Sequence, residues 1–269
     1  MKKHIFIGDV HGRDTYKQFM LSYHKYIHKT PLKGDIGNFF VENPDVRLVF
    51  VGDYFDNFDI GVAKQNENFK NIIALKKEYP QNIVLLIGNH DYHYFPDVYS
   101  QYNGYTYNRT ARILLEEYYN KGLMQVTYAI DDVLVSHAGI SKTWFKNTFD
   151  GFVNAELVDN GLYGASDVSS MINEAFNTCY GLTSKDDFEL KKARHTESYD
   201  NTGDNIWQSP IWIRPKSLLE DKLENITQIV GHSFMPHTTY NDGVWFIDTP
   251  FVHSVLAYYE NKSFQVITF

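Results

Sequence analysis

The sequence predicts an α/β protein, and two observations carry this prediction. Short apolar runs rich in valine, leucine and isoleucine, such as residues 47–51 and 82–87, each end at a glycine followed by polar residues. Stretches of helical length separate these runs, and strands that alternate with helices are typical of βαβ units with a parallel sheet. A chain of 269 residues can bury one such core, so we expect a single domain over residues 1–269.

Each expected strand is an apolar run bounded by turn residues. In chain order, the expected strands are residues 4–7, 47–51, 82–87, 124–130, 133–135, 226–230, 244–248, 254–259 and 263–269. The fourth and fifth form a hairpin in this prediction, with its turn at Asp131-Asp132. The last three strands have short connections, which favours an antiparallel sheet at the C-terminal end.

The expected helices have recognisable ends. They cover residues 15–29, 62–78, 110–120 and 167–180. Asp14 or Thr15 is suited to cap the first helix, and Pro80 ends the second. We expect residues 30–45 to be a loop. Residues 141–216 combine scattered glycines with a polar stretch at 184–205, and we expect an excursion that covers the active-site face of the sheet, not a second domain.

Composition argues against several classes of protein. The formal net charge is -8, from 25 basic and 33 acidic residues, so we expect no extended nucleic-acid surface. Cys179 is the only cysteine, which rules out an internal disulfide or a thiolate metal cluster. No apolar stretch is long enough to span a membrane, and the N-terminal apolar run is too short for a signal peptide. The expected location is the cytoplasm.

Polar residues of one kind follow the apolar strands. They are Asp9, His11, Asp53, Asp56, Asn89, His90, His137 and His232. Side chains at strand ends of an α/β sheet converge on one crevice, so we expect these residues to meet. They offer oxygen and nitrogen ligands without sulfur, which suits Mn, Fe, Zn or Ni. The set exceeds the four ligands of a structural zinc site, whereas a two-metal centre with a bridging carboxylate would use it.

Five segments resemble, in order, the motifs of calcineurin-like metallophosphoesterases. They are Gly8-Asp9-Val10-His11-Gly12, Gly52-Asp53-Tyr54-Phe55-Asp56, Gly88-Asn89-His90-Asp91, Ser136-His137-Ala138-Gly139-Ile140 and Gly231-His232-Ser233. Residues 247–249 and 256–257 are similar to the C-terminal strand pair of the branch that holds serine/threonine protein phosphatases and bacterial diadenosine tetraphosphate hydrolases. The resemblance covers about residues 4–260, and it implies a four-layer α/β/β/α sandwich with mixed sheets.

The resemblance also implies two divalent cations, with Mn²⁺ expected and Fe, Zn, Ni or Mg as alternatives. The implied ligands are Asp9 and His11 for the first metal, Asp53 as a bridge, and Asn89, His137 and His232 for the second. A hydroxide that bridges the metals would attack phosphorus in line, because metal-bound water can ionise near pH 7. His90 would protonate the leaving oxygen, and Asp56 would hold His90 in position.

The chain departs from the family pattern where phosphate is bound. The family usually has arginine directly after the Asp56 position, where this chain has Asn57, and often at the position of Ile87. Arg214 is similar in place to a family arginine that binds phosphate, so we expect phosphate to rest mainly on it. Asn57 and Arg13 are further candidates, although a solvated residue at a helix start is the simpler interpretation of Arg13.

Three functional hypotheses follow. The first is hydrolysis of phosphomonoesters, including phosphoserine or phosphothreonine. The second is hydrolysis of a dinucleoside polyphosphate. The third is a metal-binding scaffold without catalysis, which the intact pair of Asp56 and His90 argues against. The substrate would be a phosphoprotein, a small phosphate ester or a nucleotide, and the sequence leaves this choice, the native metal and the oligomeric state open.

The remaining histidines carry weaker signals. His24 and His28 share one helix face at a spacing that can bind a metal, but the sequence shows no third ligand beside them. We expect four other histidines to be surface or rim residues, namely His93, His195, His237 and His253. Of these, His93 and His237 are expected to lie near the site. Cys179 is expected to be a small buried group.

Overall fold

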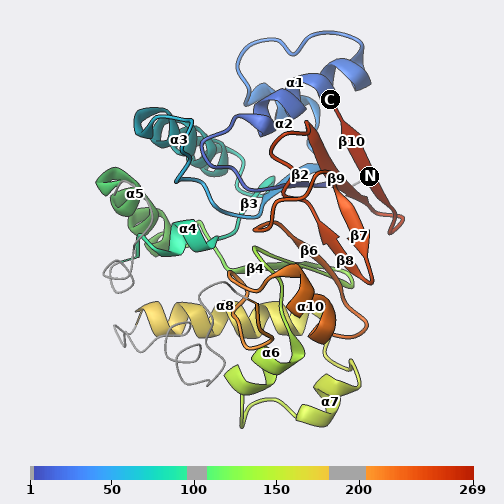
Figure 1. The fold of residues 1–269 in the computed structure, drawn as a ribbon. Coiled ribbons are helices and arrows are strands. Elements are labelled where there is room, and N and C mark those ends of the chain that lie inside the picture. The colour runs from blue at the N-terminus through green and yellow to red at the C-terminus, as the bar shows by residue number, and fades with distance from the viewer. Residues whose placement is uncertain (1–2, 96–107, 182–203) are drawn as a thin grey trace.

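The computed structural model describes residues 3–95, 108–181 and 204–269, which form two five-stranded sheets (Figure 1). The first sheet has the order β10 (Phe264–Thr268), β9 (Ser254–Tyr259), β1 (Lys3–Ile7), β2 (Val46–Phe50) and β3 (Ile83–Leu85). The second has the order β4 (Thr127–Ile130), β5 (Val133–Ser136), β6 (Thr227–Val230), β8 (Val244–Phe246) and β7 (Thr239–Asn241).

Both sheets are mixed, and their parallel strands lie together. β1, β2 and β3 are parallel, and β9 joins β1 in antiparallel register. In the second sheet β5, β6 and β8 are parallel, while β4 and β7 pair antiparallel at the two edges. The carboxyl ends of the parallel strands in one sheet therefore share an edge, which is where open α/β sheets bind their ligands.

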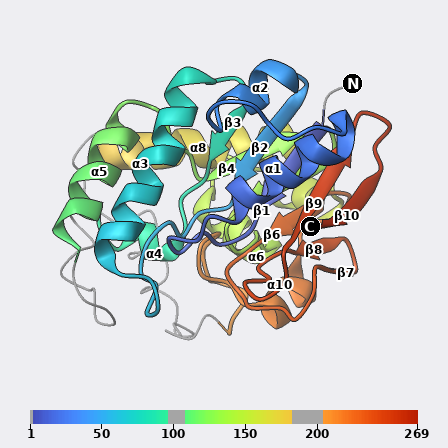
Figure 2. The same ribbon diagram turned by 90° about the horizontal axis from the view of Figure 1, so that it is seen from above.

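The two sheets pack face to face with helices outside them. Phe6, Val49 and Leu256 of the first sheet meet Val135 and Ile229 of the second in one buried cluster. Figures 1 and 2 show α1, α2, α3 and α5 over the outer face of the first sheet, with α6, α8 and α10 beyond the second. The implied four-layer α/β/β/α sandwich is thus confirmed.

The helices have these bounds in the structure. Before the second sheet come α1 (Thr15–His28), α2 (Asn38–Glu42), α3 (Val62–Glu78), α4 (Asn89–Tyr92) and α5 (Arg109–Asn120). After β5 come α6 (Lys142–Thr148), α7 (Ala155–Asp159), α8 (Ala165–Gly181) and α10 (Pro215–Asp221). No helix among the described residues is long and apolar enough to cross a membrane.

Local sequence explains where α1 and α5 begin. Asp14 occupies the N-cap position of α1, but its carboxylate accepts from Gln18 Nε2 at 2.9 Å instead of from a backbone amide. In α5 the Asn108 side chain caps the helix by accepting from the Ala111 amide at 3.0 Å. Residues three and four apart on the inner face of α1, such as Tyr16, Phe19, Met20 and Tyr23, are buried, as an amphipathic helix requires.

Two expectations about the fold are wrong. Residues 30–45 are not all loop, because α2 lies within them. The last strands do not form one antiparallel sheet: β8 pairs in parallel with β6, whereas β9 and β10 are an antiparallel hairpin in the first sheet. A short connection does not determine the pairing partner, since residues 247–253 are enough to pass between packed sheets, which lie about 10 Å apart.

The segment at 141–216 adds helices outside the second sheet. Its longest helix, α8, lies against β4, where Asn173 Oδ1 accepts from the amides of Val126 and Thr127 at 3.0 and 3.1 Å. The Thr127 hydroxyl also contacts Ser169 Oγ at 2.9 Å. The segment then returns through Trp212 to the strand ends. Most of the polar stretch expected at 184–205 lies outside the described residues.

Candidate active site

The structure brings the eight polar residues at the strand ends into one connected group. Asp9 and His11 follow β1, Asp53 and Asp56 follow β2, Asn89 and His90 lie in α4 after β3, His137 follows β5 and His232 follows β6. Ligand atoms of Asp9, Asp53 and His137 all lie within 4.8 Å of one another. The site therefore lies where the two sheets meet, with each sheet supplying part of it.

Three histidines of this group are held in the same way. Each ring donates one N–H to a backbone carbonyl, which can only accept. His11 Nδ1 donates to Phe55 O at 2.5 Å, His137 Nδ1 to Val51 O at 2.8 Å, and His232 Nε2 to Trp212 O at 3.1 Å. A neutral imidazole has one donor and one acceptor nitrogen, so each of these rings is left with an electron pair on its other nitrogen.

These remaining nitrogens face oxygen atoms. His11 Nε2 lies 3.6 Å from Asp53 Oδ2, and His137 Nε2 lies 3.4 Å from the same oxygen. Asn89 Oδ1 lies 2.9 Å from both His137 Nε2 and His232 Nδ1. Turning the Asn89 amide over would let its NH₂ group donate to the two rings. The Asp53 Oδ2 atom would still face two ring nitrogens that also accept, with no hydrogen atom between them. Electron pairs that converge in this way are the arrangement that metal ions occupy.

Glycines in the motifs make room for two of the carboxylates. A Cβ atom on Gly231 would lie 2.2 Å from Asp9 Oδ1, and one on Gly88 would lie 2.1 Å from Asp53 Oδ1. Neither position could carry a side chain without moving a buried acid. The glycine at the end of these strands is therefore required by the approach of the carboxylate to the neighbouring turn.

Four residues of the site have left-handed backbones, although none is glycine. Their φ angles are 43° at His11, 53° at Asp53, 64° at Asp56 and 62° at His232. Such a conformation costs on the order of 1 kcal/mol or more per residue and clusters at functional sites. Asp91 holds part of this backbone, because its carboxylate accepts from the amides of Asp53 at 2.7 Å and Gly88 at 2.9 Å.

The buried acids have unequal proton affinities. Burial, together with the charges of Asp248 and Asp53, raises the pKa of Asp9 well above its usual value. Burial also acts on Asp53, but attraction to the rings of His137, His90 and His11, when these carry a proton, outweighs it, so the pKa of Asp53 lies well below the usual range. Several buried carboxylates that repel one another are stabilised by a cation between them.

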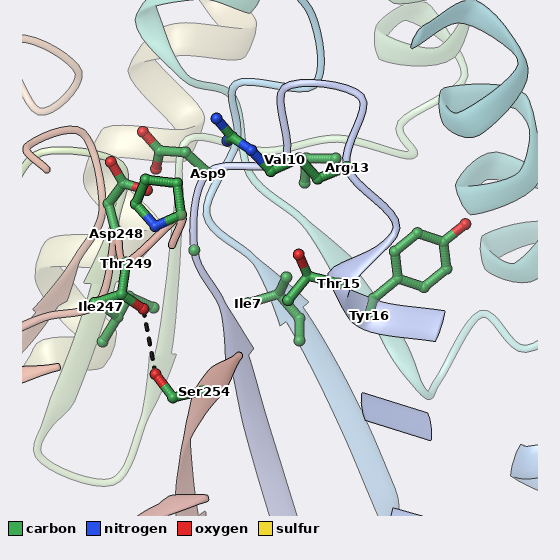
Figure 3. A pocket seen from close by; sticks show the side chains of 12 residues that line it. Ile7, Asp9, Val10, Arg13, Thr15, Tyr16, Ile247, Asp248, Thr249 and Ser254 are labelled. Atoms are coloured by element: carbon green, nitrogen blue, oxygen red, sulfur yellow. Dashed lines mark hydrogen bonds between the residues drawn. The ribbon is translucent and has the colours of Figure 1, made fainter. Parts of the chain in front are cut away.

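A pocket beside Asp9 lies between the turn after β1 and residues 247–249 (Figure 3). Its lining includes Arg13 and Asp248, and Figure 3 shows the Arg13 side chain extending toward Asp9. Arg13 is half-buried, and its Nη1 atom is buried without a hydrogen-bond partner in the described structure. Arg13 is therefore not simply a solvated residue at a helix start. Burial raises the pKa of Asp248 to about 6, and the nearby Arg13 opposes this shift.

His90 and Asp56 form a pair next to Asp53, and the His90 amide donates to Asp53 Oδ1 at 2.9 Å. His90 Nδ1 lies 3.1 Å from Asp56 Oδ2, and the Tyr94 hydroxyl donates to Asp56 Oδ1 at 2.5 Å. Burial alone would lower the pKa of His90, but the carboxylates of Asp53 and Asp56 raise it above the usual value. The His90 ring is thus oriented and favours its protonated form.

The candidate phosphate-binding residues differ in their surroundings. Arg214 Nη1 donates to Ser233 Oγ at 3.3 Å and to His232 O at 3.4 Å, so its guanidinium lies beside His232. The Asn57 side-chain oxygen accepts from the amides of Asp59 at 2.7 Å and Ile60 at 3.0 Å. That oxygen closes a turn, which leaves only the amide nitrogen of Asn57 to meet a phosphate. Ile87 is buried in the core.

Tyr94 was not singled out from the sequence, whereas Asp91 and Asp248 were noted only within segments that resemble the family. Asp248 follows an apolar run like the other acids, so the rule that identified those acids could have found it. Asp91 and Tyr94 act through contacts to Asp53 and Asp56. The carbonyl of Trp212, which orients His232, has no sequence signal because every residue carries one. Of the other histidines, His93 is half-buried, with its ring centroid 5.6 Å from that of Trp212.

His237 and His253 are exposed, as expected. The side chain of Cys179 and the whole of His195 lie outside the described residues.

Known proteins resemble this chain in sequence pattern and in fold. The family model for calcineurin-like phosphoesterases matches residues 3–260. A cold-active protein-tyrosine phosphatase from a psychrophilic Shewanella species has a TM-score of 0.50 at 18% identity, covering 100% of this chain and 81% of its own. A protein serine/threonine phosphatase from Saccharomyces cerevisiae has a TM-score of 0.52 at 14% identity, covering 100% of this chain and 79% of its own.

The two structural likenesses show the shared fold, and the family match extends over nearly the whole chain. This family depends on two metal ions, and the buried group of Asp9, Asp53 and His137 can bind metal. The chain therefore belongs to the calcineurin-like phosphoesterase family and is a metal-dependent hydrolase of phosphate esters.

Proposed function

We propose that this protein is a phosphatase that hydrolyses phosphomonoesters, including phosphoserine and phosphothreonine, with two divalent cations. The observation that supports this proposal most is the common arrangement of His11, His137 and His232. Each ring is anchored by a carbonyl and turns its free nitrogen toward oxygen ligands. This is how proteins orient histidines that bind metals.

In this proposal the first cation rests on Asp9 and His11, and the second on Asn89, His137 and His232. Asp53 serves both, since its Oδ2 atom faces His11 and His137. Mn²⁺ is the expected metal, with Fe, Zn, Ni and Mg as alternatives, because oxygen and nitrogen donors alone do not select one of them. When bound, the cations supply an activated water as nucleophile and neutralise the phosphate.

His90 is the proposed proton donor to the leaving oxygen. Its protonated form is favoured by two nearby carboxylates, and its Nδ1 atom is occupied by Asp56 at 3.1 Å. The Nε2 atom is the one that can face a substrate. Asp56 is a positioning residue here, and the Tyr94 hydroxyl fixes its other oxygen. A scaffold without catalysis would need none of this arrangement.

Positive charge for the phosphate comes from two arginines in this proposal. Arg214 lies beside His232, and Arg13 extends into the pocket next to Asp9 with a buried Nη1 that has no hydrogen-bond partner in the described structure. The guanidinium group pairs well with phosphate oxygens because it donates through two parallel N–H groups. Asn57 is the weakest of the three candidates because its oxygen is occupied.

A second candidate function is hydrolysis of a dinucleoside polyphosphate, and one observation favours it. Phe234 and Phe251 are 55% and 81% exposed, and their ring centroids lie 5.5 Å apart. Phe234 is two residues from His232, and Phe251 is three residues from Asp248. Exposed aromatic rings beside a phosphate site can stack on a nucleobase, because every base has a π-face.

The test compares leaving groups. With Mn²⁺, the purified protein should hydrolyse both an aryl and an alkyl phosphate. The His90→Ala variant should lose about 10²–10⁴-fold in rate on the alkyl ester, whose leaving oxygen needs a proton, and less on the aryl ester. His237→Ala is the matched control, because His237 is exposed and lies outside the pair with Asp56. Equal losses on both esters, or none, would remove His90 from this role.

Substrate choice needs a second comparison under the same conditions. Peptides with phosphoserine, phosphothreonine or phosphotyrosine and diadenosine tetraphosphate should be compared by kcat/KM. We expect a phosphopeptide to be preferred. A preference for the dinucleotide that falls in Phe251→Ala would favour the second candidate function instead.

For location we propose the cytoplasm, with which a single cysteine agrees.

A further inference from the structure

A second group of possible metal ligands lies outside the active site. His24 and His28 are on α1, and Glu42 is the last residue of α2. One possible ligand atom from each lies within 4.8 Å of the others. We infer that His24, His28 and Glu42 form a separate binding site for one transition-metal ion such as Zn²⁺. This inference does not depend on the proposed phosphatase activity.

The two imidazoles are brought together by the helix itself. Residues four apart lie on one face, and the two rings stack with centroids 4.4 Å apart and an interplanar angle of 25°. Asn43, next to Glu42, orients the outer ring: its Oδ1 atom accepts from His28 Nε2 at 3.2 Å, while its Nδ2 atom donates to Phe39 O at 2.9 Å. A hydrogen bond from one ring nitrogen to a fixed acceptor is usual for histidines that bind metals.

The inner ring shows that ordinary packing is an incomplete explanation. His24 is 1% exposed, so both ring nitrogens need partners within the protein. Its Nε2 atom lies 3.5 Å from Glu42 Oε2, which is longer than a normal hydrogen bond. Its Nδ1 atom is buried with no hydrogen-bond partner among the described residues. The described residues give neither nitrogen a normal hydrogen bond, and a metal ion bound between His24 and Glu42 would supply a partner for one of the two.

The chemistry and access of this group fit a transition metal. Two imidazoles and one carboxylate are ligands that Zn²⁺ accepts, and three protein ligands leave a coordination position for water. His28 is exposed and the Glu42 side chain is 41% exposed, so an ion can enter from solvent. His28 lies about 20 Å along α1 from Thr15, at a rise of about 1.5 Å per residue, so the group is remote from the turn after β1.

A metal bound here would join α1 to α2. The two helices are separated in the chain by residues 29–37, and α2 is only five residues long. One ion held by ligands from both helices would fix the position of α2 against the first layer. The expected consequence is local stabilisation without a change in the chemistry of the active site.

The experiment counts metal ions per chain. Metal-free full-length protein is equilibrated by dialysis against micromolar Zn²⁺, and bound zinc is measured by mass spectrometry. His28→Ala and Glu42→Gln should each bind one zinc fewer per chain than the unmodified protein. Lys25→Ala is the matched control, since Lys25 is exposed on the same helix outside the group, and it should bind the unmodified number.

A second measurement separates metal binding from misfolding. Zn²⁺ should raise the Tm of the protein more than that of His28→Ala, while the aryl phosphatase rates with Mn²⁺ agree within about twofold. His28 and Glu42 are exposed, so these variants should fold. Equal zinc counts in the protein and in both variants would overturn the inference and leave His24 and Glu42 as an ion pair.

Discussion

The two groups of possible metal ligands differ in how firmly their side chains are held. In the active site, His11, His137 and His232 each donate to a backbone carbonyl, and the carboxylates are buried. Between α1 and α2, two of the three ligands are exposed, and a side-chain amide holds only one ring. Ligands fixed before the metal arrives lose less entropy on binding. The comparison predicts a preorganised catalytic centre and a weaker, exchangeable outer site.

The chain distances between the ligands differ too. The outer ligands come from residues 24–42, whereas the active site joins Asp9 to His232 through the His232 amide, which lies 3.0 Å from Asp9 Oδ1. The active site therefore exists only when both sheets are in place. The outer group needs only α1, α2 and the loop between them.

The largest expected effect is that of Asp53→Asn. The carboxylate faces both His11 and His137, so its loss should lower kcat/KM by about 10³-fold or more, because activation of a water by the metals depends on its ligands. Zinc counting should show loss of active-site metal while one zinc remains between α1 and α2. If both sites emptied together, the two groups would not be independent.

A smaller effect is expected for Asp56→Asn, which tests whether His90 must be held in position by a carboxylate. Loss of a partner that orients a functional histidine typically lowers activity by about 10–100-fold, so we expect a fall of this size in kcat. The carboxylate of Asp56 contributes to the raised pKa of His90, so its removal should lower that pKa. Activity that needs protonated His90 is lost as pH rises through this pKa. The alkaline limb of the kcat profile should therefore move to lower pH, and an unmoved limb would contradict the role of the pair.

Arg214→Ala should act on substrate and not on metal. We expect about a tenfold rise in KM for phosphate esters, the size of one lost charge-assisted hydrogen bond, with an unchanged zinc count. Arg214→Lys keeps the charge without the planar pair of donors and should recover part of the loss. An unchanged KM in both variants would mean that Arg13 alone meets the phosphate.

The smallest expected effect concerns Asp248 in metal-free protein. Its pKa is raised from 3.8 to about 6, so the folded state holds the proton more tightly than the unfolded state. The stability from this proton is present below pH 3.8 and is lost as pH rises through about 6. At pH 7–8, the free energy of unfolding of Asp248→Asn should exceed that of the unmodified protein by on the order of 1 kcal/mol. The full shift of the pKa is not counted for Asp248 alone, because Asp9 titrates together with it.

Two changes of condition serve as controls for the comparison between Asp248→Asn and the unmodified protein: a lower pH and the addition of metal. Near pH 4 the two proteins should unfold alike, as chemical denaturation can measure. Adding Mn²⁺ at pH 7–8 should remove the difference, because the cation stabilises the ionised carboxyl groups. A difference that persists with metal would place Asp248 outside the influence of the centre.

Much of the active site is predictable from the sequence because of one topological rule. Polar residues directly after apolar strands lie at the carboxyl ends of parallel strands, and these ends share an edge. That rule places Asp9, Asp53 and Asn89 together without any knowledge of contacts. It also explains the mistake about the last strands, since alternation and loop length describe a strand but not its partner.

The features of the site that the sequence could not predict depend on groups without a sequence signal. The carbonyls of Val51, Phe55 and Trp212 orient three histidines, yet every residue has a carbonyl. Glu42 completes a metal-ligand group only because a short helix, too brief to show a period, turns it toward His24. The order of the chain determines which residues end its strands, whereas the direction of a hydrogen bond or lone pair is determined by packing in three dimensions.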